Sequence, residues 1–219
     1  MARDYRRTHI KMCGMTRPED LIKACQLGVD AVGLVFYPPS PRSLSLALAE
    51  PLAALTPALT RRVALMVNPD AGFVREVVAA TQADMLQFHG DESADFCQQF
   101  GKPYIKALRV KNAAEVVGLI TQHRAADLIL LDAYVPGIPG GTGQTFDWSL
   151  VPDTLAAKVM LAGGLNETNV PVAIERIRPY AVDVSGGIET APGIKSADKM
   201  ALFVQAVMAA DRLVSEISS

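Results

Sequence analysis

The sequence has few cysteines, no long apolar run and no strong charge of one sign. Three cysteines among 219 residues are too few for a disulfide scaffold, and the odd count leaves one unpaired. No apolar run approaches the length of a membrane span, and no signal-peptide core follows the charged N-terminus. A net charge of −2 gives no general attraction for nucleic acid or an anionic membrane. We therefore expect a cytoplasmic protein without nucleic-acid or membrane partners, which holds any anionic ligand by local donors.

Signatures of metal and nucleotide binding are also missing. The three histidines, His9, His89 and His123, lack the spacing of metal ligands. The sequence has no P-loop, no CxxC motif and no Ser-His-Asp order, and no G-x-G-x-x-G follows its first predicted strand. These absences argue against a metal ion or a nucleotide cofactor.

The sequence does contain an alternation that is repeated eight times. Each unit starts with a short apolar, β-branched run and passes through turn residues into a segment with helical periodicity. Gly28 closes the first helix, and Pro51 is expected to interrupt or kink the second. Strands are predicted at residues 8–13, 31–36, 63–67, 85–89, 104–110, 128–132, 159–162 and 181–185. Helices are predicted at 18–27, 44–55, 72–80, 94–100, 113–123, 170–177 and 197–217, with a Gly/Pro-rich loop at 135–145 before a poor helix around Trp148.

Continuous apolar strands that alternate with helices imply a parallel sheet buried on both faces. Eight such units without a linker or a break in composition favour a closed barrel over an open doubly wound sheet. We therefore predict an α/β protein, a single (β/α)8 TIM barrel that spans residues 1–219 and has a short or irregular sixth helix.

Two glycine pairs occupy the ends of the last two predicted strands. Gly163 and Gly164 follow the seventh strand, and Ser185, Gly186 and Gly187 end or follow the eighth. The carboxyl ends of the strands face the active site of such a barrel, and glycines there let a phosphate approach backbone N–H groups. The alternative is a pair of ordinary turns that need positive φ. Two pairs at adjacent strand ends favour a phosphate site.

Two further strand ends carry candidate acid–base groups. Cys13 is the only cysteine at a predicted strand end, since Cys25 and Cys97 fall within helix patterns. A thiolate there could act as a base if nearby donors lower its pKa, and a packing role fits its position equally well. Asp132 ends an apolar strand, where partial burial would raise the pKa of its carboxyl and suit it to donate a proton. A helix cap or a salt bridge to Arg109 is the alternative.

Arg42 lies in a Ser-Pro-Arg segment after the second predicted strand. Its guanidinium could bind a substrate carboxylate through two hydrogen bonds. A solvated loop charge fits the same position, and the sequence context does not choose between the two.

Short motifs follow one another along these strand ends. They are KMCGMT at 11–16, GLVF at 33–36, SPR at 40–42, QFHG at 87–90, LD at 131–132, GGTG at 140–143, FDW at 146–148, LAGGLN at 161–166 and DVSGGIE at 183–189. Together they resemble phosphoribosylanthranilate isomerase over essentially the whole chain. The resemblance implies a barrel of tryptophan biosynthesis that catalyses an Amadori rearrangement without metal or organic cofactor. Its substrate is N-(5-phosphoribosyl)anthranilate and its product the 1-(2-carboxyphenylamino)-1-deoxyribulose 5-phosphate isomer.

The resemblance also assigns roles to individual residues. Asp132 would be the general acid that opens the sugar ring, and Cys13 the general base that removes the C2 proton. Arg42 would hold the anthranilate carboxylate, with His89 and Asp183 also at the substrate. The phosphate would be bound around Gly163, Gly164, Ser185, Gly186 and Gly187. The loop at 135–145 would close over the substrate as a lid.

The chain departs from the family pattern at two positions. Many members have two serines where this chain has Ser185 and Gly186, which removes one hydroxyl donor to the phosphate, and Phe88 replaces a common leucine. The related isomerase of histidine synthesis needs carboxylates where this chain has Cys13 and Arg109. Indole-glycerol-phosphate synthase would need a lysine at the first strand end, and ribulose-phosphate epimerase a metal set. Another phosphosugar isomerase or a non-catalytic barrel that binds a phosphorylated metabolite is the alternative, and both a monomer and a homodimer fit.

Overall fold

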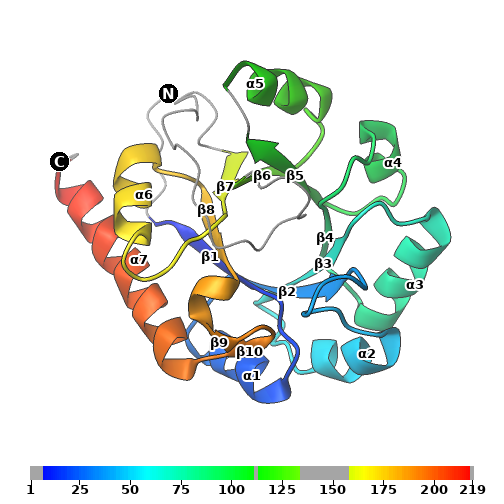
Figure 1. The fold of residues 1–219 in the computed structure, drawn as a ribbon, viewed down its shortest axis with the longest axis horizontal. Coiled ribbons are helices and arrows are strands. Elements are labelled where there is room, and N and C mark those ends of the chain that lie inside the picture. Colours follow the sequence, from blue (N-terminus) through cyan, green and yellow to red (C-terminus); the bar gives the residue numbers. More distant parts are fainter. Residues whose placement is uncertain (1–6, 111–112, 134–157, 218–219) are drawn as a thin grey trace.

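The computed structural model describes residues 7–110, 113–133 and 158–217, and its centre is a closed barrel of eight parallel strands. Each strand pairs with the next in sequence, and the eighth pairs with the first (Figure 1). The strands are β1 (His9–Cys13), β2 (Ala31–Phe36), β3 (Arg61–Met66), β4 (Met85–Phe88), β5 (Tyr104–Val110), β6 (Leu128–Ala133), β7 (Val159–Leu161) and β8 (Ala181–Val184). The predicted (β/α)8 barrel is thus confirmed.

Helices surround the barrel and cover the outer face of its strands (Figure 1). They are α1 (Pro18–Gln26), α2 (Leu46–Ala54), α3 (Ala71–Thr81), α4 (Ala94–Gln98), α5 (Ala113–Gln122), α6 (Val170–Ile177) and α7 (Ala197–Ile217). No helix in the described ranges is long and apolar enough to cross a membrane. The predicted lid at 135–145 and the poor helix around Trp148 lie outside the described residues.

The predicted elements match the observed ones apart from their ends. β3 begins two residues early, because Arg61 and Arg62 pair in register with β2 although they are polar. α2 begins late, because the Ser45 side chain caps it by accepting a hydrogen bond from the backbone N–H of Leu48. The same helix continues through Pro51 and is not interrupted there. A proline within a helix removes one intrahelical hydrogen bond and crowds the preceding turn, but Ala49, Leu52 and Ala53 pack α2 into the hydrophobic core on either side of it.

Between β8 and α7 the chain forms small elements that the sequence did not predict. A 3₁₀ turn covers Gly186–Ile188, and a two-stranded antiparallel sheet follows, made of β9 (Glu189–Ala191) and β10 (Ile194–Lys195). The small sheet lies beside α1 (Figure 1), where the backbone N–H of Lys195 donates to Asp20 Oδ2 over 3.0 Å. This segment brings Glu189 and Lys195 to the barrel mouth.

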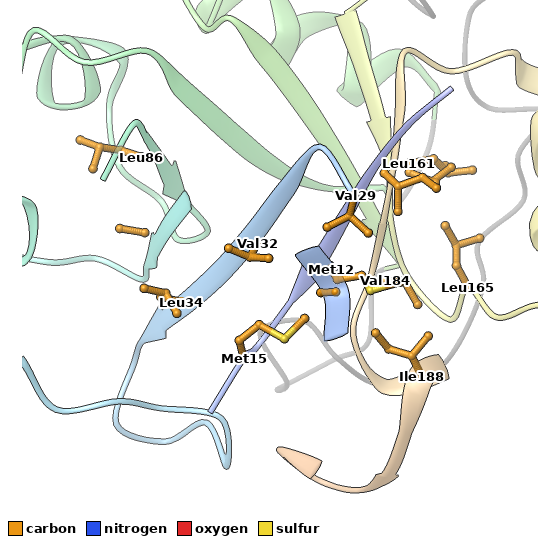
Figure 2. Packing of buried hydrophobic residues seen from close by; sticks show 14 of the residues in the cluster. Met12, Met15, Val29, Val32, Leu34, Leu86, Leu161, Leu165, Val184 and Ile188 are labelled. Atoms are coloured by element: carbon orange, nitrogen blue, oxygen red, sulfur yellow. The ribbon is translucent and has the colours of Figure 1, made fainter. Parts of the chain in front are cut away.

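Strand residues alternate between the outside and the inside of the barrel. In β1, Ile10 and Met12 belong to the main hydrophobic core between strands and helices, part of which Figure 2 shows around Met12. Cys13 belongs instead to a small separate cluster with Val35 and Leu65. The alternation therefore places Lys11 and Cys13 on the inner side of β1.

Asp30, just before β2, ties the start of the barrel together. Its carboxylate accepts hydrogen bonds from Arg7 Nη1 and from the backbone N–H of Ile10, both over 2.8 Å, and lies 3.0 Å from His9 Nδ1. Burial by itself would raise the pKa of Asp30, but the hydrogen bonds from His9, Arg7 and Ile10 hold it well below its usual range. The charged carboxylate therefore stabilises the folded state.

We expect Asp30→Asn to lower the free energy of unfolding by about 1–3 kcal/mol near neutral pH. A carboxyl whose pKa is depressed by folding contributes stability above its unfolded value of 3.8 and loses it as the pH falls through the folded value. The gap between wild type and variant should therefore shrink toward acid pH. Urea unfolding over a pH series measures this, and a gap that stays constant would contradict it.

Candidate active site

The predicted site residues meet in one pocket at the carboxyl ends of the barrel strands. The pocket is lined by residues in or just after β1, β2, β3, β4, β6, β7 and β8, and hydrophobic side chains such as Val35 and Leu65 form part of its wall. Every site residue predicted from the sequence lines it: Cys13, Arg42, His89, Asp132, Gly163, Gly164, Asp183, Ser185, Gly186 and Gly187.

Cys13 ends β1 with only 4% of its surface exposed. Its neighbour in register on β2 is Gly33, where an added Cβ would lie 2.6 Å from Cys13 Sγ. A glycine is therefore required at that position to leave room for the thiol. The space next to the sulfur is thus determined by the strand pairing.

The charges around Cys13 act in opposite directions on its thiol. Burial raises the pKa of Cys13 most strongly, and the negative charge of Asp183 raises it further. The positive charges of Lys11 and Lys195 lower it, but the net direction is upward from the ordinary value of 9.0. Donors that lower the pKa are present, as the sequence argument required, but they do not outweigh burial. The thiol form therefore predominates near neutral pH in the unliganded protein.

Asp132 lies at the end of β6, and its side chain is 6% exposed. His89 Nε2 lies 3.3 Å from Asp132 Oδ2, at ion-pair distance, and makes no hydrogen bond. On the other side of the imidazole ring, Gln87 Nε2 lies 3.1 Å from His89 Nδ1. Gln87 is fully buried and was not singled out from the sequence, although it belongs to the QFHG motif. His89 thus lies between Gln87 and Asp132, and both His89 and Asp132 line the pocket.

Arg42 is not a solvated loop charge. Its side chain is 13% exposed, and its guanidinium forms a bidentate pair with Glu189, with Nε–Oε1 at 2.8 Å and Nη2–Oε2 at 2.7 Å. Glu189 also accepts from Lys195 Nζ over 2.8 Å. Burial alone would raise the pKa of Glu189, but the two cations lower it. Two positive charges thus share one carboxylate, which leaves this side of the pocket suited to an anion.

Sequence reasoning missed Glu189 and Lys195. Lys195 is fully buried at its side chain and donates to the backbone carbonyl oxygens of Cys13 and Ser185, over 2.6 and 3.2 Å. It therefore joins the ends of β1 and β8. Glu189 was within the quoted DVSGGIE motif, whereas nothing in the sequence singles out Lys195.

Asp183 lies in β8 with its carboxylate 2.8 Å from Lys11 Nζ. Burial raises the pKa of Asp183, and the charge of Asp132 adds to this, against the opposing effect of Lys11. Lys11 was missed as a site residue although it opens the KMCGMT motif. In the part of the chain that the structure describes, no group of three or more His, Cys, Asp or Glu side chains is placed to hold a metal ion.

Glycine is needed in the two pairs for different structural reasons. Gly163 and Gly164 have φ values of +84° and +62°, so the turn after β7 needs glycine for its backbone conformation. Gly187 has no such φ, but an added Cβ there would lie 1.9 Å from the carbonyl oxygen of Leu165. The loops after β7 and β8 therefore pack backbone against backbone. Both loops line the pocket, so their backbones border the same space.

We expect Gly187→Ala to raise the KM for a phosphorylated substrate by about tenfold or more, because one of the two loops must move to admit the methyl group. The control is Gly118→Ala in α5, where an added Cβ meets nothing within 4 Å. Competition by inorganic phosphate separates a phosphate effect from a general one. A variant with unchanged KM and unchanged phosphate inhibition would argue against phosphate binding between these loops.

Comparisons with known proteins agree on one family. The model of the family described as N-(5'phosphoribosyl)anthranilate (PRA) isomerase matches residues 10–206. The N-(5'-phosphoribosyl)anthranilate isomerase of Azotobacter vinelandii is 51% identical over 197 residues, which cover 90% of this chain and 96% of that protein.

Solved structures give the same result. The chain is similar to a phosphoribosyl anthranilate isomerase in complex with reduced 1-(o-carboxyphenylamino)-1-deoxyribulose 5-phosphate, with TM-score 0.82, 33% identity, and 92% of this chain and 99% of the other covered. Monomers of the dimeric isomerase from Thermotoga maritima match with TM-score 0.83 and 33% identity over 92% and 99% of the two chains. The chain belongs to the N-(5'-phosphoribosyl)anthranilate isomerase family.

Proposed function

We propose that this isomerase converts N-(5-phosphoribosyl)anthranilate into 1-(2-carboxyphenylamino)-1-deoxyribulose 5-phosphate, with Asp132 as general acid and Cys13 as general base. The observation that carries the proposal is the pocket that Cys13 and Asp132 line together with Arg42 and the paired glycine loops. The substrate has a carboxylate at one end and a phosphate at the other. A guanidinium and a glycine-rich backbone edge are suitable partners for these two groups.

The reaction needs one proton donor and one proton acceptor. Asp132 donates a proton to the ring oxygen of the sugar, the C1–O bond breaks, and the anthranilate nitrogen lone pair forms the Schiff base. Cys13 as thiolate then removes the proton from C2, and the electron pair moves to give an enolamine, which tautomerises to the ketone. One proton enters and one leaves, so the overall change is an isomerisation. The two groups come from β6 and β1, which lie on different sides of the barrel mouth (Figure 1).

The other predicted residues bind and orient the substrate. Arg42, which Glu189 holds through two hydrogen bonds, receives the anthranilate carboxylate. Asp183 and His89 lie at the sugar, and the backbone around Gly163, Gly164, Ser185, Gly186 and Gly187 receives the phosphate. The substitution of a second serine by Gly186 leaves backbone N–H groups as the main donors there.

The direct test follows the fluorescence of N-(5-phosphoribosyl)anthranilate as the purified wild-type protein consumes it. Loss of substrate with appearance of the ketose product is expected. Binding of the reduced product analogue without turnover would instead favour a non-catalytic barrel that binds a phosphorylated metabolite. We assign the protein to the cytoplasm and to a monomer or homodimer, in line with a relative that is described as dimeric. Size-exclusion chromatography with light scattering distinguishes the two assemblies.

A further inference from the structure

Lys11 is a buried charge to which the proposed mechanism gives no role. Its side chain is 1% exposed and is among the largest fully buried side chains of the protein. A buried ammonium group is costly unless it is paired and hydrogen-bonded. An apolar residue on the inner side of β1 would avoid this cost, so the lysine calls for a functional explanation.

The barrel fixes the position of Lys11 through one specific partner. Lys11 of β1 stands in register with Asp183 of β8, and its Nζ lies 2.8 Å from Asp183 Oδ1. Lys11 and Cys13 are two residues apart on the same strand, so their side chains point to the same, inner side. The ammonium that Asp183 holds therefore lies on the same buried side of β1 as the Cys13 sulfur, and its positive charge acts on that thiol.

We propose that Lys11 is the positioning residue of the general base: its ammonium, anchored by Asp183 on the inner side of β1, stabilises the neighbouring Cys13 sulfur as the thiolate through its positive charge. This inference deepens the proposed function and rests on the role of Cys13 as the base. Lys11 itself does not remove the proton. Its charged neighbours raise the pKa of Lys11 above 10.5 despite its burial, so it stays protonated.

Other charged groups around Cys13 are less suited to this role. Lys195 of β10 faces the same cysteine, but its Nζ bonds the Cys13 backbone carbonyl and is paired with Glu189. Arg42, in the loop after β2, is bound to the same glutamate through two hydrogen bonds. Asp183 of β8 opposes thiolate formation. Of the two lysines, Lys11 has the larger lowering effect on the pKa of the thiol.

The test measures the thiolate of Cys13 without relying on turnover. The rate of Cys13 alkylation by iodoacetamide is followed over a pH series, with peptide mapping to separate Cys13 from Cys25 and Cys97. Lys11→Met is expected to move the midpoint upward by about one pH unit or more, which lowers the alkylation rate near neutrality about tenfold. Lys11→Arg, which keeps the charge, should recover most of this loss.

A matched control comes from a second buried lysine of the same barrel. Lys106 of β5 is 3% exposed at its side chain and pairs with Glu92 over 2.7 Å, and β5 lies four strands away from β1 in the barrel order. Lys106→Met should therefore lower stability without moving the alkylation midpoint of Cys13. If Lys11→Met does not fold, Lys11→Gln is measured in the same way. An unchanged midpoint in a folded Lys11 variant overturns the inference.

The outcome also separates this inference from the proposed function. If the alkylation midpoint of Cys13 shifts in the Lys11 variants but the wild type shows no turnover, the proposed activity is wrong and the role of Lys11 stands. If the wild type turns over its substrate but the alkylation midpoint does not change in the Lys11 variants, the proposed activity stands and the inference about Lys11 is wrong. In an active protein, Lys11→Met should shift the rise of kcat/KM with pH by the same amount as the alkylation midpoint. Loss of stability alone would not move this midpoint.

Discussion

Asp132→Asn is expected to lower kcat by about 10²–10⁴-fold, the range that a positioned general acid contributes. The amide has the shape of the carboxyl group but no proton that it can transfer to the ring oxygen. The side chain is nearly buried at the end of β6, 3.3 Å from His89, so water does not easily replace it as the donor. Binding of the reduced product analogue should change little, because the pocket keeps its shape.

The measurement combines steady-state kinetics with titration of that analogue. Asp127→Asn is the control, because Asp127 lies just before the same strand and accepts from the backbone N–H of Tyr104 over 3.0 Å, at the opposite end of the barrel. It should cost stability but leave kcat near the wild-type value. A variant of Asp132 that keeps full activity would remove this residue from the mechanism, and another donor would have to be sought along the pocket.

The barrel was predictable because its strands are buried on both faces. β2 reads AVGLVF and is buried at every position, so its sequence shows continuous hydrophobicity bounded by turns. β9 and β10 were not predictable, because they contain three and two residues and have no apolar pattern. They depend on tertiary contacts, among them the hydrogen bond from Lys195 to Asp20, 175 residues away in sequence.

The candidate site was predictable only as far as strand ends identify it. In a parallel barrel all carboxyl ends meet at one mouth, so Cys13 and Asp132 were placed together by topology. The charged partners were not placed, because Glu189 meets Arg42 from a segment 147 residues away. Lys11 did carry a signal, since a charged residue within a buried strand is rare unless it is paired. Its partner is Asp183, 172 residues away, and only the structure reveals it.

The raised pKa of Cys13 could not be predicted from the sequence either. The sequence showed a cysteine at a strand end but not how burial would compare with the charges around it. Burial has the largest effect, and Lys11 and Lys195 offset only part of it. As a consequence, kcat/KM of the wild-type protein should rise with pH above neutrality, because the fraction of thiolate increases until the raised pKa is passed.

Cys13→Ser is expected to lower kcat by about 10²–10⁴-fold and to remove this rise of kcat/KM with pH. A hydroxyl group is a much weaker acid than a thiol, so the serine holds its proton throughout the pH range in which the protein is folded. The hydroxyl oxygen is smaller than the sulfur and fits beside Gly33, so a steric conflict would not explain the loss. Binding of the reduced product analogue should therefore be retained.

The pH dependence decides whether Cys13 is the base. Cys25→Ser in α1 is the control, because Cys25 lies outside the pocket and the same chemical change there should leave both kcat and the pH profile unaltered. If Cys13→Ser still shows the rise of kcat/KM with pH, at the wild-type midpoint, another group removes the C2 proton. If this rise disappears and kcat falls, the group that titrates and the base are the same sulfur. The buried environment of Cys13 then sets the pH at which the isomerisation becomes fast.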